Sequence, residues 1–162
     1  MMDVGGQLVA VGAGQTFDVQ APPQGGYVLY VGVRARNLDP CGVMLRGQLL
    51  DATSGAAASD LDGRKADLHP TGDGWWAPDV SDPFDVPNVP TCPDYTGGTA
   101  LGRPLLARVQ LTDRAGRTAT ATSPSLQLDC PRDACYADCR CRCAADYDAQ
   151  SCEHLDGGVC LR

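Results

Sequence analysis

Apolar and polar residues alternate with a period of two along several short segments, which is typical of half-buried β-strands. The clearest segment is 27–38, where apolar side chains occupy one face, and Arg34 and Arg36 occupy the other. The same pattern predicts strands over residues 7–12, 16–21, 27–38, 41–50, 74–77, 105–112, 117–122 and 126–128.

The last two of the longer strands form a predicted hairpin. Alternation along residues 105–112 stops at Asp113-Arg114-Ala115-Gly116, and a second alternating segment begins at Arg117. Gly116 suits the left-handed position of a short hairpin loop. By contrast, residues 56–73 are polar and weakly patterned. Residues 83–102 are expected to be a loop, because four prolines suit a central strand poorly.

About seven short strands in some 120 residues predict an all-β fold, an antiparallel β-sandwich. No helix is expected in this part of the chain. The phase of the alternation assigns the following residues to the core: Leu29, Val31, Val33, Leu45, Leu49, Val109 and Leu111.

Three segments resemble bacterial immunoglobulin-like modules of exported and cell-surface proteins. They are 109–119 (VQLTDRAGRTA), 45–55 (LRGQLLDATSG) and 72–76 (GDGWW). The resemblance covers roughly residues 7–129 and implies an immunoglobulin-like β-sandwich. It further implies a spacer, adhesive or carbohydrate-contacting role, with no shared catalytic residues to assign.

Cysteines divide the chain into two regions. Seven of the nine lie in the last 33 residues, so we expect a sandwich over residues 1–129 and a disulfide-stapled tail over 130–162. Thiolate metal sites usually contain C-x2-C pairs, and the sequence has none. Disulfides are therefore favoured over metal. The disulfide candidates are Cys41, Cys92, Cys130, Cys135, Cys139, Cys141, Cys143, Cys152 and Cys160.

The pairing of these cysteines stays partly open. Cys139, Cys141 and Cys143 are too close in sequence to bridge one another readily, so the triplet is expected to pair outward, with Cys130, Cys135, Cys152 or Cys160. Cys41 and Cys92 either bridge each other, remain free, or reach the tail. Because nine is an odd number, at least one cysteine is free, intermolecular or metal-bound.

The net charge of the chain and the compartment that its cysteines imply limit the classes of function to consider. A net charge of −7 argues against nucleic acid as a partner. No apolar run approaches the length of a membrane span. Residues 1–6 lack the features of a signal peptide, yet the cysteine content favours an oxidising compartment. We therefore expect a secreted, periplasmic or cell-surface protein whose export signal is not in this chain. The absence of isoleucine and the single lysine indicate a GC-rich, bacterial genome.

Catalytic patterns are missing. His69 and His154 have no H-E-x-x-H or G-x-S-x-G context. Trp75 and Trp76 are adjacent, so in a strand they face opposite sides, one toward the core and one outward. We expect a non-enzymatic structural or binding module, monomeric, without cofactor or metal, whose partner is a protein or carbohydrate at the cell surface. The alternative is a thiol-based metal-binding or redox protein that acts through the tail.

Overall fold

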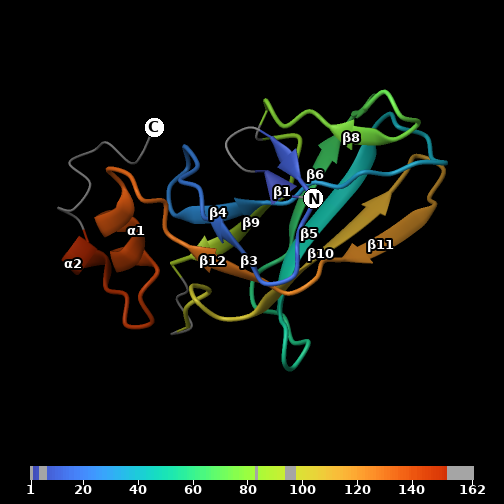
Figure 1. Cartoon of the computed structure of the whole chain (residues 1–162). Coiled ribbons are helices and arrows are strands. Elements are labelled where there is room, and N and C mark those ends of the chain that lie inside the picture. Colours follow the sequence, from blue (N-terminus) through green and yellow to red (C-terminus); the bar gives the residue numbers. More distant parts are fainter. Residues whose placement is uncertain (1, 4–6, 83, 94–97, 153–162) are drawn as a thin grey trace.

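A computed structural model describes residues 2–3, 7–82, 84–93 and 98–152 (Figure 1). Strands dominate, and the helices lie in the C-terminal region, which confirms the all-β class of the body. The elements are β1 (Met2–Asp3), β2 (Leu8–Val9), β3 (Gln15–Asp18), β4 (Tyr27–Tyr30), β5 (Val43–Asp51), β6 (Asp62–Ala66), β7 (Leu68–Pro70), β8 (Trp76–Pro78), β9 (Asn88–Cys92), β10 (Leu105–Thr112), β11 (Thr118–Thr122), β12 (Leu126–Asp129), α1 (Tyr136–Arg142) and α2 (Ala149–Cys152).

The largest sheet has the strand order β3-β12-β10-β5-β6, and β11 pairs with β10 beside this path. β10 and β5 pair antiparallel over the full length of β10, from Leu105 opposite Asp51 to Thr112 opposite Met44. β3 and β12 pair in parallel, from Gln15 opposite Leu126 to Asp18 opposite Asp129. The sheet is therefore mixed, and the expectation of a wholly antiparallel fold is wrong. Alternation reports which face a side chain occupies, but not the direction of the neighbouring strand.

A smaller sheet of β4 and β9 shares the main core with the large sheet. Leu29, Val31 and Val89 pack with Leu49, Leu105 and other inward residues of the large sheet. Gly47 marks the closest approach of the two layers. A Cβ at this position would lie 2.8 Å from Cβ of Pro87 and 2.9 Å from Cγ2 of Val89, so a larger residue in β5 would push the layers apart.

The predicted core is largely confirmed. Six of the seven residues are buried: Leu29, Val31, Leu45, Leu49, Val109 and Leu111. Val33 is half-buried and packs against two core clusters. Gly116, with φ of 79°, forms the predicted turn of the β10–β11 hairpin. The strand phase read from the sequence is therefore correct in β5 and β10.

Several elements differ from the prediction. Strands β6 and β7 lie within residues 56–73, for which no strand was predicted. The predicted strand over residues 27–38 ends at Tyr30, and beyond it an isolated bridge joins Ala35 to Trp76. The predicted loop over residues 83–102 contains β9. Pro90 is tolerated in β9 because this strand pairs with β4 in a two-stranded sheet, where a missing N–H can face away from the ladder.

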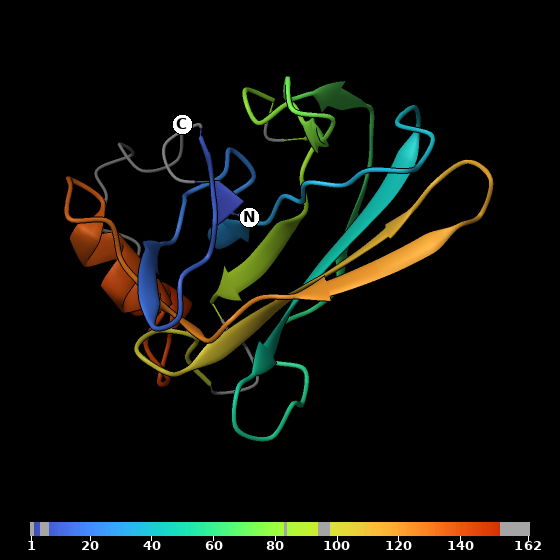
Figure 2. The ribbon, with the colours of Figure 1, turned by 45° about the vertical axis from the view of Figure 1, so that its right-hand side comes forward.

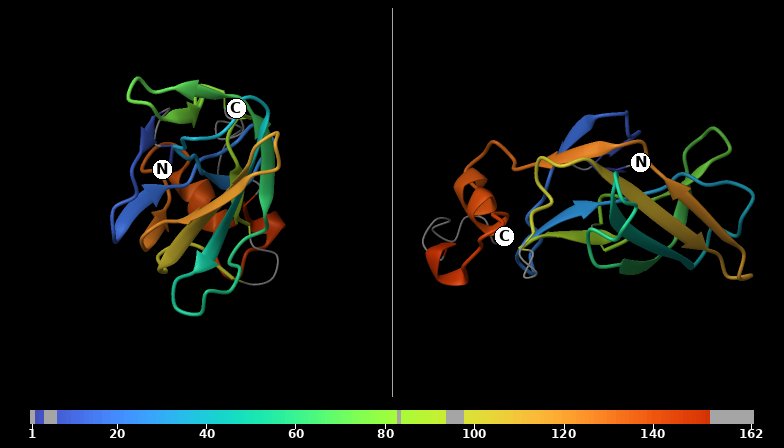
Figure 3. Two further views of the ribbon diagram at one scale, coloured as in Figure 1. Left: turned by 90° about the vertical axis from the view of Figure 1, so that its right-hand side faces the viewer. Right: turned by 90° about the horizontal axis from the view of Figure 1, so that it is seen from below.

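The C-terminal helices lie at one end of the molecule, and the turn of the β10–β11 hairpin lies at the other (Figure 2). The view from below shows the same separation (Figure 3). Cys139 and Cys143 of this region are buried in the same cluster as the residues between the two sheets. The tail therefore completes one end of the main core.

Candidate functional site

One buried disulfide joins the tail to the body, and a second lies beside it within the tail. Cys92 at the end of β9 is bonded to Cys143, and Cys130 after β12 is bonded to Cys139 in α1. The Sγ atoms of Cys139 and Cys143 are 3.9 Å apart, because these residues are one helical turn apart on the same face of α1. All four cysteines are buried. The cluster is therefore part of the protein core.

The remaining cysteines resolve most of the open pairings. Cys141 is bonded to Cys152, and Cys135 is also disulfide-bonded. Among the described residues, Cys41 is the free cysteine, and it is exposed. Cys160 lies outside the described residues. Cys139 and Cys141 pair with cysteines of the tail, as predicted, whereas Cys143 pairs with Cys92, which is not one of the four partners expected for the triplet.

The bridge between Cys41 and Cys92 does not form. Cys92 instead pairs with Cys143 of the tail. A bond from a body cysteine to the tail was one of the alternatives that the sequence left open. Cys41 precedes β5, whereas Cys92 ends β9 beside the helices. The spacing of the cysteines along the sequence does not reveal at which end of the body each of them lies.

The disulfide cluster offers little to a metal or to redox chemistry in its oxidised form. The Sγ atoms of Cys130, Cys139 and Cys143 all lie within 4.8 Å of one another. Metal binding and nucleophilic attack both need a thiolate, and each of these sulfurs is in a disulfide. Burial further limits access by an external thiol. The arrangement is that of a structural cross-link.

A second feature is an open groove between β11 and the segment that follows β4. One part has a volume of about 380 Å³, and an adjoining part has about 240 Å³. Both parts are lined by Val33, Val109 and Ala121, so they adjoin one another along β11. Ala121 faces the same side as its partner Val109, yet it is exposed. We call this feature the β11 groove.

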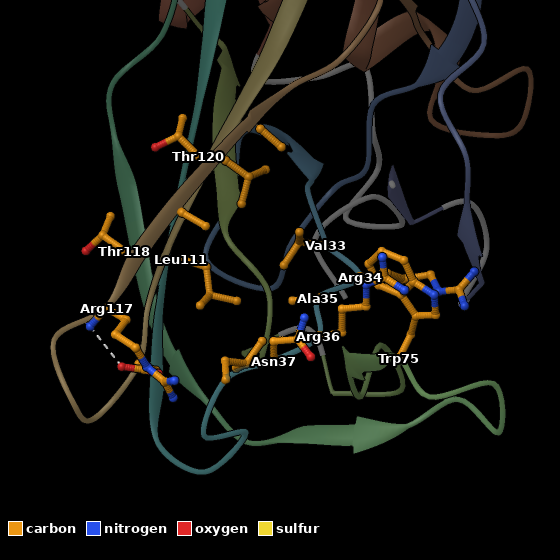
Figure 4. Close-up of a pocket in the computed structure, with 15 residues that line it drawn as sticks. Val33, Arg34, Ala35, Arg36, Asn37, Trp75, Leu111, Arg117, Thr118 and Thr120 are labelled. Carbon is orange, nitrogen blue, oxygen red and sulfur yellow. Dashed lines mark hydrogen bonds and ion pairs between the residues drawn. The ribbon is translucent and has the colours of Figure 1, made fainter.

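Charged residues lie on two sides of the larger part of the β11 groove, with Arg34 beside Trp75 on one side and Arg117 on the other (Figure 4). The guanidinium carbons of Arg34 and Arg36 lie 5.5 Å and 4.8 Å from the centre of a Trp75 ring, within the range of a cation–π interaction. Arg117 forms an ion pair at 2.7 Å with the buried carboxylate of Asp113. Three arginines and one aspartate therefore line the groove.

The position of Arg34 is fixed by a neighbouring loop. Arg34 donates a hydrogen bond to the carboxylate of Asp73, and Thr71 donates another to the same carboxylate at 2.7 Å. The hydrogen bond from Thr71, followed by that from Arg34, lowers the pKa of Asp73 to about 2. Asp73 is thus ionised at neutral pH and holds Arg34 beside Trp75.

The two tryptophans take the opposite roles that their adjacency predicts. Trp76 packs against the core cluster of Val43 and Leu45. Trp75 lies outside this cluster and stacks with Arg34 and Arg36. The groove itself was missed by sequence reasoning. Its available signal was the combination of two arginines on one face of residues 27–38 with an unexplained tryptophan.

Two further polar residues, His69 and Asp62, lie on separate strands. His69 is exposed in β7. Asp62 accepts hydrogen bonds from Arg64 and from the backbone N–H of Asn88. His154 lies outside the described residues.

No protein-family model matches this chain, and no curated protein or solved structure shows significant similarity to it. Within the described ranges, no helix is both long and apolar enough to cross a membrane.

Proposed function

We propose that this chain is an immunoglobulin-like β-sandwich module of an exported bacterial surface or envelope protein, with a non-enzymatic structural or binding role. The observation that carries the proposal is the buried disulfide cluster that fastens the tail to the sandwich core. Such cross-links form and persist in oxidising compartments. The proposed location is therefore secreted, periplasmic or at the cell surface.

The sheet arrangement supports the immunoglobulin-like part of the proposal. One sheet contains β3, β12, β10, β5 and β6, and the facing sheet contains β4 and β9. Two facing sheets with the core between them are the architecture of such sandwiches. The tight turn from Asp113 to Gly116 matches the segment on which the resemblance rests.

The β11 groove supports a binding role within this module. It combines apolar lining with a few fixed polar groups, which is the composition of a recognition site. A protein or a carbohydrate at the cell surface remains the proposed class of partner.

The oxidation state of the native protein tests the proposal. Protein from an oxidising compartment should contain the three bridges described above, a reactive thiol at Cys41, and no stoichiometric zinc, copper or iron. Thiol alkylation followed by mass spectrometry identifies the bridges and the free thiol, and elemental analysis measures the bound metal. Six or more free thiols together with bound metal would favour the metal-binding alternative instead.

A further inference from the structure

The outer edge of β11 is available for backbone pairing. β11 pairs with β10 from Thr118 opposite Thr112 to Thr122 opposite Arg108. Within the described parts of the chain, no strand or isolated bridge pairs with its other side. All five residues of β11 are exposed.

The hydrogen-bonding phase identifies the groups at this edge. The N–H of Asp113 donates to the carbonyl of Arg117, and the N–H of Ser123 donates to the carbonyl of Ala107. Bonded and non-bonded pairs alternate along an antiparallel ladder, so Ala119 and Ala121 bond to β10. The N–H and carbonyl groups of the three threonines therefore point to the open side; they are Thr118, Thr120 and Thr122.

This edge lacks the usual protection against pairing. Natural sheets protect their edges with charged residues, proline or bulges. β6, at another edge of the same sheet, carries Arg64 and Lys65. β11 contains only threonine and alanine, and threonine favours strands. An unprotected strand of this composition is suited to accept another strand.

The apolar face of β11 determines which side chains of an added strand would fit. Ala119 and Ala121 lie opposite Leu111 and Val109 on the groove side. An added strand would continue this inner face, so its alternate side chains would enter the apolar β11 groove. Small or β-branched apolar residues match this space.

The charge of the groove favours an acidic partner. The chain carries a net charge of −7, yet three arginines line this groove. Arg117 is paired with Asp113, and Arg34 is paired with Asp73, whereas Arg36 stacks on Trp75 and forms no ion pair with a described residue. A carboxylate of a partner would complement Arg36.

We propose that β11 is the docking edge for an extended segment of a partner protein, with apolar residues at alternate positions and a carboxylate beside Arg36. The segment would bind by β-strand addition, in which backbone hydrogen bonds provide affinity and alternate side chains provide specificity. This inference rests on the proposed binding role and names the partner as polypeptide.

A phage-displayed library of random 12-residue peptides, selected on the oxidised full-length protein, provides the probe. The selected peptides should alternate apolar residues and include Asp or Glu. Their affinity, measured by fluorescence polarisation, is then compared between two variants at one position. Thr120→Pro removes the outward N–H without breaking the β10 ladder, whereas Thr120→Ala retains that N–H.

Strand addition predicts at least about tenfold weaker binding for Thr120→Pro and a change of less than about twofold for Thr120→Ala. Arg36→Glu should also weaken binding about tenfold, whereas Arg132→Glu, the same charge change in the tail, should not. Ala121→Arg, at an exposed position, places a large side chain in the groove and should also weaken binding. This variant provides a second test if Thr120→Pro misfolds.

Equal affinities for the two Thr120 variants, or a library without selected peptides, would overturn the inference. Concentration-dependent dimerisation that Thr120→Pro abolishes would identify a second copy as the occupant and would also overturn it. None of these outcomes concerns the disulfides, so free thiols with bound metal would separately overturn the proposed function.

Discussion

The hydroxyl of Tyr27 donates a hydrogen bond of 2.8 Å to the carboxylate of Asp138. Tyr27 begins β4 in the body, and Asp138 lies in α1 of the tail. Both residues are buried, and Arg142 donates to the other oxygen of the same carboxylate at 2.7 Å. Burial, followed by the hydrogen bond to Asp138, raises the pKa of Tyr27 well above its ordinary value. A neutral tyrosine therefore joins the two regions beside the disulfide cluster.

Tyr27→Phe should lower the free energy of unfolding by about 1–3 kcal/mol, because it leaves a buried carboxylate with one fewer donor. Urea unfolding monitored by circular dichroism measures this change. Tyr136→Phe is the matched control, since Tyr136 is exposed and its change should stay within about 0.5 kcal/mol. Equal effects of the two substitutions would show that the Tyr27 contact contributes nothing specific.

Removal of the Cys92–Cys143 bridge should destabilise the protein strongly. The bridge spans a sequence separation of 51 residues, for which the loop-entropy model gives about 4 kcal/mol. The double variant Cys92→Ser/Cys143→Ser should therefore unfold at a clearly lower urea concentration. Cys41→Ser, at an exposed free cysteine, should leave the unfolding midpoint unchanged. A double variant as stable as the parent would contradict the structural role of the bridge.

Strand phase can be tested with adjacent residues of β10. Val109→Asp places an unpaired charge in the core and should prevent folding, whereas Gln110→Asp on the outer face should be tolerated. The yield of soluble protein and its β-type circular dichroism distinguish the two. Comparable damage from both substitutions would mean that the phase is wrong.

The carboxyl group of Asp73 should titrate near pH 2, below its ordinary value of 3.8. Because its pKa is lower in the folded state, the contacts of Asp73 contribute stability above about pH 4, which is lost as the pH falls toward 2. Carboxyl chemical shifts measured by NMR give the pKa directly. Thr71→Ala and Arg34→Ala should each raise it, while the pKa of Asp79, lowered by Ser81, should not change. An unchanged pKa of Asp73 in both variants would exclude these contacts as its cause.

The sequence predicted the inner face of the body well, because burial and alternation are local properties of a strand. Leu45 and Leu49 share one face in β5, and both are buried where that face predicts. The turn at Gly116 was equally local. By contrast, the parallel pairing of β3 with β12 joins segments more than 100 residues apart, and nothing in either segment encodes direction.

The disulfides show the same division between local and long-range information. The outward pairing of Cys139 and Cys141 follows from their spacing, whereas the partner of Cys143 depends on where β9 ends in space. The β11 groove was not predictable either. It arises because β4 ends at Tyr30 and leaves the inner face of β11 uncovered.

Disulfide mapping of the native, non-reduced protein by mass spectrometry tests the central claim most directly, namely that the tail is covalently joined to the β-strand body. Trypsin cuts after Arg140 and Arg142 and so separates the cysteines of the triplet. The account predicts cross-linked fragments for Cys92–Cys143, Cys130–Cys139 and Cys141–Cys152, with Cys41 alkylated as a free thiol. A bridge between Cys41 and Cys92, or free thiols at Cys92, Cys130, Cys139 and Cys143, would contradict it.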